Sequence, residues 1–227
     1  MFRPLLWTFL CLLGLVACAP QSATPSSGAG QKKPLVYVAI GASDAVGVGA
    51  GGPEESWVGD LARKLPPGSR LVNLGISGEK LQGALVDELP VAVDANPDLV
   101  TIWLAVNDLN ARVTAESYER DLDAMLSALQ RQTHAHVVIG NVPDLSLVPA
   151  YGGIDHTALA QEVDRWNAII ARQAALHGAT VVDIHASWTD LAAHPEYVGI
   201  DGFHPSVEGY QRLADLFSAT LQTKGLI

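Results

Sequence analysis

Five short runs of apolar residues, rich in β-branched side chains, recur along the chain after residue 34. Each run is apolar on both faces, which is typical of buried parallel strands rather than of antiparallel strands with one face in water. Their spacing leaves room for a helix between successive strands. The predicted strands are Leu35–Ile40, Arg70–Leu74, Leu99–Leu104, His136–Gly140 and Thr180–Ile184.

Apolar residues at three- and four-residue spacing predict helices between these strands. Gly178 is suited to end the third of these helices, and Pro205 is suited to begin the last. Strands and helices in alternation predict an α/β fold, a single doubly wound five-stranded parallel sheet with helices on both faces, over residues 34–227. The helices are marked by Trp57, Leu61 and Leu65, by Leu122, Leu126 and Leu129 within residues 114–133, by Val163, Trp166, Ile169 and Ile170, and by Tyr210, Leu213, Leu216 and Phe217.

The first 33 residues follow a different pattern. Arg3 is the only charge before Lys32, and it precedes an apolar run over residues 5–16 that is too short to span a bilayer comfortably. A basic start followed by such a run is typical of an export signal. The run ends in Leu15-Val16-Ala17-Cys18, which resembles the lipobox of bacterial lipoproteins.

This resemblance implies that residues 1–17 are a signal peptide and that Cys18 carries the lipid. Residues 18–33 would then join the lipid to the domain as a flexible linker rich in Pro, Ser and Gly, and the domain would face the periplasm or exterior of a bacterial cell envelope. An ordinary secretory signal or an uncleaved anchor would explain the same residues without lipidation.

Composition narrows the possible partners of the chain. The 227 residues include 14 Lys and Arg against 24 Asp and Glu, a net charge of -10, so we expect no nucleic-acid partner. Cys11 and Cys18 are the only cysteines, and both precede the predicted domain. The domain therefore has no thiol for a disulfide or for a cysteine-based metal site. We expect a monomer.

Reactive side chains follow several of the predicted strands. Ser43 comes just after the first strand, Gly75 after the second and Asn107 after the third, while Asp201 and His204 lie near the C-terminus. Open parallel sheets form their sites beyond the carboxyl ends of the strands, so we expect these residues at one edge. A hydroxyl, an Asp/His pair and amide donors are the groups that acyl transfer requires.

Together these blocks resemble the SGNH, or GDSL-type, hydrolase family, over residues 35 to about 220. The resemblance implies a flavodoxin-like fold and a Ser43, His204, Asp201 catalytic triad, with an oxyanion hole formed by Ser43, Gly75 and Asn107. Asn141-Val142-Pro143-Asp144, after the fourth strand, is also similar to that family. Two positions depart from its pattern, because the residue before Ser43 is Ala42 instead of an acid, and the glycine two residues before Asn107 is Ala105.

Two other motifs point to different chemistry. The segment Gly47–Gly52 matches G-x-G-x-x-G, the motif of dinucleotide sites, but the second strand ends at Asn73 with no acid to bind a ribose. We therefore interpret it as a flexible loop at the mouth of the site and expect no cofactor. His134 and His136 alternate on one strand without an evident third ligand, so we expect no metal.

The sequence thus predicts an exported, lipid-anchored serine esterase acting on small or lipid-like carboxylic or thio esters through an acyl-enzyme. An esterase or acyltransferase acting on O-acyl groups of envelope carbohydrate would use the same residues, and a non-catalytic binding lipoprotein on this scaffold is the alternative outside enzymes. We expect specificity to come from three loops, Val46–Gly52, Gly78–Pro97 and Leu145–His156. Apolar residues predict a wall beside the site at Leu145, Leu147, Val148 and Tyr151.

Overall fold

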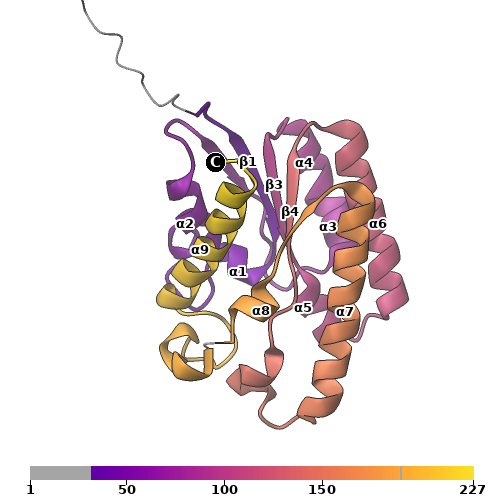
Figure 1. The fold of residues 1–227 in the computed structure, drawn as a ribbon, viewed down its shortest axis with the longest axis vertical. Helices are drawn as coiled ribbons and strands as arrows, with labels where there is room; N and C mark the ends of the chain where they lie inside the picture. Colours follow the sequence, from indigo (N-terminus) through magenta and orange to yellow (C-terminus); the bar gives the residue numbers. More distant parts are fainter. Residues whose placement is uncertain (1–31, 190) are drawn as a thin grey trace, which may run out of the picture. The chain divides into compact units, whose positions relative to one another are not determined.

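A parallel sheet of five strands forms the centre of the molecule (Figure 1). The computed structural model describes residues 32–189 and 191–227. The strand order is β2-β1-β3-β4-β5, so the chain reverses direction across the sheet between β1 and β3, and the predicted doubly wound sheet is confirmed. The strands are β1 (Val36–Gly41), β2 (Arg70–Asn73), β3 (Leu99–Trp103), β4 (His136–Gly140) and β5 (Thr180–Val182).

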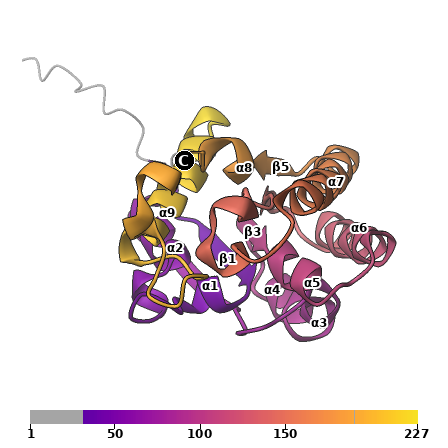
Figure 2. The same cartoon turned by 90° about the horizontal axis from the view of Figure 1, so that it is seen from below.

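Helices cover both faces of this sheet. Helices α1 (Ser43–Val46), α2 (Trp57–Lys64) and α9 (Val207–Thr223) lie on one face, as Figures 1 and 2 show. The other face carries α3 (Leu81–Asp87), α4 (Leu89–Asp94), α6 (Ala115–Gln132) and α7 (His156–His177). Two short helices, α5 (Ala105–Asn110) and α8 (Ile184–Ser187), follow β3 and β5 at the carboxyl ends of the strands.

Each face of the sheet has its own aromatic contact. Trp57 of α2 stacks on Phe217 of α9 with ring centroids 4.3 Å apart, and both side chains are fully buried. On the other face Tyr118 of α6 packs against Trp166 of α7 at 4.4 Å. Burial of each such ring contributes about 1.5–3 kcal/mol, so these pairs attach the helical layers to the sheet.

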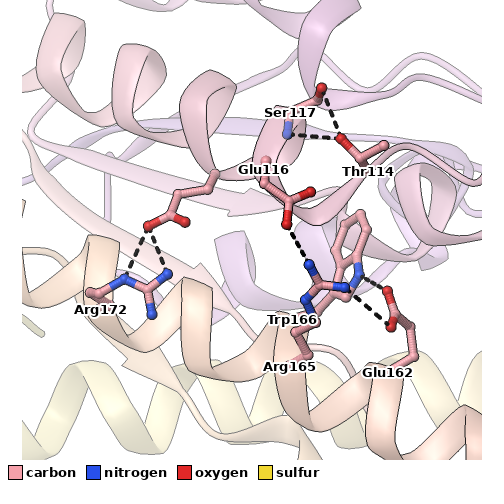
Figure 3. Close-up of polar contacts among 8 residues, drawn as sticks. Thr114, Glu116, Ser117, Glu162, Arg165, Trp166 and Arg172 are labelled. Atoms are coloured by element: carbon pink, nitrogen blue, oxygen red, sulfur yellow. Dashed lines mark hydrogen bonds and ion pairs between the residues drawn. The ribbon is translucent and has the colours of Figure 1, made fainter.

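Ion pairs add to the contact between α6 and α7 at the surface. Arg165 of α7 binds Glu116 of α6, and Arg172, seven residues further along α7, binds Glu119 of α6 (Figure 3). Both arginines are about half exposed, so each pair contributes roughly 1 kcal/mol or less. The apolar seam between the helices therefore provides most of their attachment.

The observed helix ends follow the capping signals with small shifts. Gly178 ends α7 in the left-handed conformation with φ 68°, as predicted. The last helix begins two residues later than expected, at Val207. The Ser206 side chain accepts the Gly209 N–H as its N-cap, and Pro205 precedes this cap instead of beginning the helix. A side-chain cap satisfies a free N–H of the first turn, which a proline at this end cannot do.

Residues 78–97, expected to be a specificity loop, instead contain α3 and α4. The two helices have only seven and six residues, and Pro90 is the second residue of α4. A helix of fewer than two turns has too few residues for its periodicity to be evident in the sequence. Leu81, Ala84, Leu89 and Ala92 are buried, so this segment is part of the packed layer beside β1.

Lys32, at the start of the described chain, lies close to the C-terminus. Its Nζ donates a hydrogen bond of 3.3 Å to the carbonyl of Gly225. No helix within residues 32–189 and 191–227 is long and apolar enough to cross a bilayer. The predicted signal segment 1–17, Cys18 and most of the predicted linker lie outside the described residues.

Candidate active site

A continuous chain of hydrogen bonds joins Ser43, His204 and Asp201. Ser43 begins α1 directly after β1, and its Oγ lies 2.9 Å from His204 Nε2. His204 Nδ1 lies 2.6 Å from Asp201 Oδ2. Ser43 lies more than 150 positions from Asp201 and His204 in the sequence, and the fold brings the three side chains together.

The Asp201–His204 turn is held by its own backbone. Asp201 Oδ1 accepts the N–H groups of Phe203 at 2.9 Å and His204 at 3.0 Å, while Gly202 takes a left-handed φ of 73°. Burial alone would raise the pKa of Asp201, but the hydrogen bonds from the His204 ring and these two N–H groups lower it below its usual value. Asp201 is therefore charged at neutral pH and accepts from the imidazole.

The glycine-rich segment Gly47–Gly52 packs against this turn. A Cβ at Gly49, which has φ 92°, would lie 2.7 Å from the Pro205 carbonyl oxygen and 3.0 Å from His204 Cβ. The Tyr210 hydroxyl donates to the Val48 carbonyl at 2.7 Å, so the segment is anchored. Its glycines permit close approach to His204 and do not form the tight turn between a strand and a helix that dinucleotide binding requires.

The three expected oxyanion donors differ in the hydrogen-bond acceptors that they have in this structure. The Ser43 N–H lies in the first turn of α1, where backbone donors have no acceptor within the helix. The Gly75 N–H donates to Asn73 Oδ1 at 3.1 Å, and Asn107 Nδ2 donates to the Glu79 carbonyl at 2.8 Å. A carboxamide has two N–H bonds, so Asn107 retains a second donor.

Gly75 is packed too closely for a larger residue. An added Cβ would lie 2.7 Å from Ala45 Cβ and 3.0 Å from the Ala42 carbonyl oxygen. Asn73 links the same two elements, because its Nδ2 donates to the Ala45 carbonyl at 2.7 Å while its Oδ1 accepts the Gly75 N–H. This side chain fixes the strand that ends before Gly75 against the helix that carries Ser43.

The two departures from the family pattern fit the backbone. Ala42 is 3% exposed, and its carbonyl accepts the N–H groups of Ala45 and Val46 in α1. Ala105 is the first residue of α5 and is not among the described residues with positive φ. A position with ordinary helical φ accepts alanine without strain, so the missing glycine is tolerated.

A largely apolar cavity opens beside Ser43 and His204. It encloses about 680 Å³ of empty space, including the part open to solvent. Among the described residues that line it, Asp44 is the only acidic one. The remaining walls are formed by Ala42, Trp103, Leu104, Val106, Asn107, Pro143, Leu145, Val148, Trp188, Leu191, Tyr197, Val198, Phe203 and Pro205.

The apolar wall was predicted only in part. Leu145 and Val148 line the cavity, whereas Leu147 and Tyr151 do not, and residues 78–97 do not contribute. The second wall was missed: it comes from Trp188, Leu191 and Tyr197, in a segment of short 3₁₀ turns before Asp201. Such turns have no periodic pattern in the sequence that would indicate which side chains face a site.

Glu88 and Asp108 are buried at this edge of the sheet, and Asp44 is half-buried in the cavity lining. Glu88 is 1% exposed; its Oε2 accepts the Gly41 N–H at 2.9 Å, and its Oε1 has no partner among the described residues. Burial raises the pKa of Glu88 to about 8, opposed by that hydrogen bond. Burial also raises the pKa of Asp44 and of Asp108 to about 6 each.

These raised pKa values predict that the protein is more stable at pH 5 than at pH 8. Between the unfolded and folded pKa values the folded state retains protons that the unfolded chain has lost, so stability falls as pH rises through this window. Each unit of pKa difference corresponds to about 1.4 kcal/mol, and we expect the melting temperature to rise by several degrees on acidification from pH 8 to pH 5.

The contribution of Glu88 to this pH dependence can be isolated by Glu88→Gln, which should flatten the melting temperature between pH 5 and pH 8. Glu119→Gln is the control, because the hydrogen bond from Arg172 lowers the pKa of Glu119 and moves its titration below that range. Equal pH dependence in the wild type and Glu88→Gln would contradict the assignment.

The described part of the chain contains no group of three or more His, Cys, Asp or Glu side chains arranged to hold a metal. His134 and His136 lie at the opposite end of the sheet from Ser43, at the start of β4.

The chain is also similar in sequence to a known protein family. The sequence profile of the GDSL-like Lipase/Acylhydrolase family matches residues 39–212. The sequence has no significant match among curated proteins.

Solved structures share the fold at low sequence identity. TesA is 23% identical with a TM-score of 0.67, over 85% of this chain and 99% of its own. LAE5, an alpha/beta hydrolase enzyme from the metagenome of Lake Arreo, Spain, is 22% identical with a TM-score of 0.68, over 85% and 96%. Axe2, an acetylxylan esterase from Geobacillus stearothermophilus, is 18% identical with a TM-score of 0.65, over 84% and 95%.

Proposed function

Because the chain belongs to the GDSL-like lipase/acylhydrolase family, and is therefore an ester hydrolase, we propose that Ser43, His204 and Asp201 are its catalytic triad. The observation that carries this proposal is the unbroken path from Ser43 Oγ through the His204 ring to Asp201. A base within hydrogen-bond reach of a hydroxyl, itself oriented by a carboxylate, is the arrangement that activates a serine nucleophile.

In the first half of the reaction Ser43 Oγ attacks the ester carbonyl carbon while His204 Nε2 takes the hydroxyl proton. The C–O bond to the alcohol then breaks, and the same proton passes from Nε2 to the departing oxygen. Water attacks the acyl-enzyme in the second half. Its proton moves through Nε2 back to Ser43 Oγ as the acid is released. Asp201 keeps the Nδ1 proton in place and stabilises the imidazolium that forms twice per cycle.

The developing oxyanion requires donors near Ser43. The Ser43 N–H and the second N–H of Asn107 are available, and both residues line the cavity. The Gly75 N–H would join them by leaving or sharing its bond to Asn73 Oδ1. Each such donor is typically worth about 3–4 kcal/mol in the barrier, so two preorganised donors already provide a large part of the stabilisation.

The cavity lining favours an apolar acyl group. Trp103, Leu104, Val106, Leu145 and Val148 contribute apolar surface close to Ser43. Each buried methylene of a substrate contributes about 0.8 kcal/mol, so kcat/KM should rise with acyl length until the cavity is full. A series of p-nitrophenyl esters from acetate to decanoate tests this: a steady fall beyond acetate would contradict an acyl site, and no hydrolysis of any ester would contradict the proposed function.

A second candidate is removal or transfer of O-acyl groups on envelope carbohydrate. The similarity in fold to an acetylxylan esterase is the observation that favours it. The triad is the same, and only the acceptor, water or a sugar hydroxyl, differs between hydrolysis and transfer. Two assays would separate hydrolysis from transfer. Release of acetate from acetylated xylan would indicate hydrolysis, and formation of an acetylated oligosaccharide from an acetyl ester with added oligosaccharide would indicate transfer. An inert protein in all of these assays would indicate the binding-protein alternative.

We also propose that Cys18 is lipidated and holds the domain at a bacterial membrane, facing the periplasm or exterior. The support is the sequence Leu15-Val16-Ala17-Cys18 at the end of the apolar run. When the full-length chain is expressed in a bacterium fed an alkyne palmitate, the wild type should be labelled and recovered with membranes. Cys18→Ser should lose the label, while Cys11→Ser should keep it, and label retained by Cys18→Ser would refute the assignment.

A further inference from the structure

Trp103 lies between the catalytic cavity and the hydrophobic core. It is the last residue of β3, is 8% exposed and lines the cavity. On its other side it meets Trp57 edge to face, with ring centroids 6.1 Å apart, and Trp57 is fully buried. The indole of Trp103 therefore separates the cavity from the core on this side.

The Trp103 ring is fixed in this position. Its Nε1 donates to the Asn141 carbonyl at 3.1 Å. Asn141 is itself held by the segment that follows β5. Its Nδ2 donates to Asp183 Oδ1 at 2.8 Å, and its Oδ1 accepts the His185 N–H at 2.9 Å. A ring held by a hydrogen bond to a fixed carbonyl cannot swing aside without leaving a buried acceptor unpaired.

Gly140 on β4 provides the space for this ring. A Cβ at Gly140 would lie 2.8 Å from Trp103 Cδ1, 2.8 Å from Ile184 Cδ1 and 3.2 Å from Phe217 Cζ. These contacts are tighter than packed side chains allow, so a side chain here would displace the Trp103 ring or the ends of Ile184 and Phe217. The missing side chain at residue 140 therefore helps to fix the position of the Trp103 ring beside the cavity.

We propose that Trp103 determines the acyl-chain length that the enzyme accepts, with its indole as the floor against which the end of the acyl chain rests. This inference rests on the proposed esterase function and specifies its substrate as esters of short- to medium-chain acids. A rigid floor admits chains up to a fixed length, and further methylenes must leave the apolar cavity for the solvent side. The kcat/KM for ester hydrolysis should therefore fall abruptly once the acyl chain exceeds a particular length.

Trp103→Phe tests the floor directly. The smaller ring deepens the cavity, so kcat/KM for the first ester that the wild type disfavours should rise relative to butyrate by about ten-fold, the effect of fitting an additional methylene. Trp166→Phe is the matched control. Trp166 is also buried, also donates its indole N–H, to Glu162 at 2.8 Å, and also packs on an aromatic ring, but it does not line the cavity.

Gly140→Ala should act in the opposite direction, since it moves the Trp103 ring into the cavity and shortens the accepted chain. The expected result is a longer preferred ester in Trp103→Phe, a shorter one in Gly140→Ala and an unchanged profile in Trp166→Phe, with melting temperatures measured for all three. If the profile of Trp103→Phe matches the wild type while that variant remains folded and active, the inference is wrong. Absence of hydrolysis by the wild type would instead contradict the proposed function.

Discussion

Ser43→Ala is expected to lower kcat for p-nitrophenyl esters by about 10⁴–10⁶-fold, because no covalent acyl-enzyme can form without the Oγ nucleophile. KM should change little, since the apolar walls and the Asn107 donor remain. The melting temperature should also stay close to that of the wild type, because only one half-buried oxygen is removed. Purified protein should be assayed over long times to quantify the residual rate.

Ser77→Ala is the control for this substitution, because Ser77 lies in the exposed loop just after Gly75 and near-native activity is expected. The same pair of variants can be treated with a fluorophosphonate probe, which labels activated serines. The wild type and Ser77→Ala should be labelled and Ser43→Ala should not. Near-native activity or labelling in Ser43→Ala would show that another residue is the nucleophile.

The second large effect concerns the base and its partner. His204→Ala should lower kcat by about 10⁴–10⁶-fold, because the proton of Ser43 then has no acceptor, whereas Asp201→Asn should cost about 10–100-fold less. Asp201→Asn retains a side chain that can accept the N–H groups of Phe203 and His204, so it disturbs mainly the tautomer and orientation of the ring. Both variants should be compared at several pH values.

His194→Ala controls for the loss of a histidine in the same region. His194 Nδ1 bonds Glu196 Oε1 at 2.7 Å, a pair similar to His204 and Asp201, but Ser43 is not its partner. His194→Ala should retain most of the activity. A larger loss in Asp201→Asn than in His204→Ala would contradict the roles proposed for the two residues.

The sequence was sufficient to predict the sheet because its central strands, β1 and β3, are apolar runs. The residues of β3 are all buried, and no polar face obscures their pattern. Ser43, Gly75, Asn107, Asp201 and His204 could be found because each follows a strand or precedes a helix, which places it at one edge of the sheet. Their hydrogen-bond partners were not predictable to the same degree.

Contacts that leave no recognisable pattern in the sequence account for what it did not reveal. The Glu88 carboxylate accepts the N–H of Gly41, which lies 47 positions away in the sequence. The Asn73 side chain accepts the N–H of Gly75, two residues further along the chain. Neither contact has a spacing that distinguishes it from an ordinary helix start or turn. The wall from Trp188 to Val198 was missed for a related reason, since irregular backbone determines which of its side chains face the cavity.

The hydrogen bond from Lys32 to Gly225 has a consequence for how the enzyme meets its substrate. The chain enters β1 at Val36 and leaves it at Gly41, about 20 Å further on, immediately before Ser43. Both ends of the domain therefore lie at the rim remote from the cavity mouth. A bead, surface or fusion partner joined to either end of residues 32–227 therefore leaves that mouth unobstructed, so an enzyme immobilised in this way keeps its opening free for polymers or dissolved substrates.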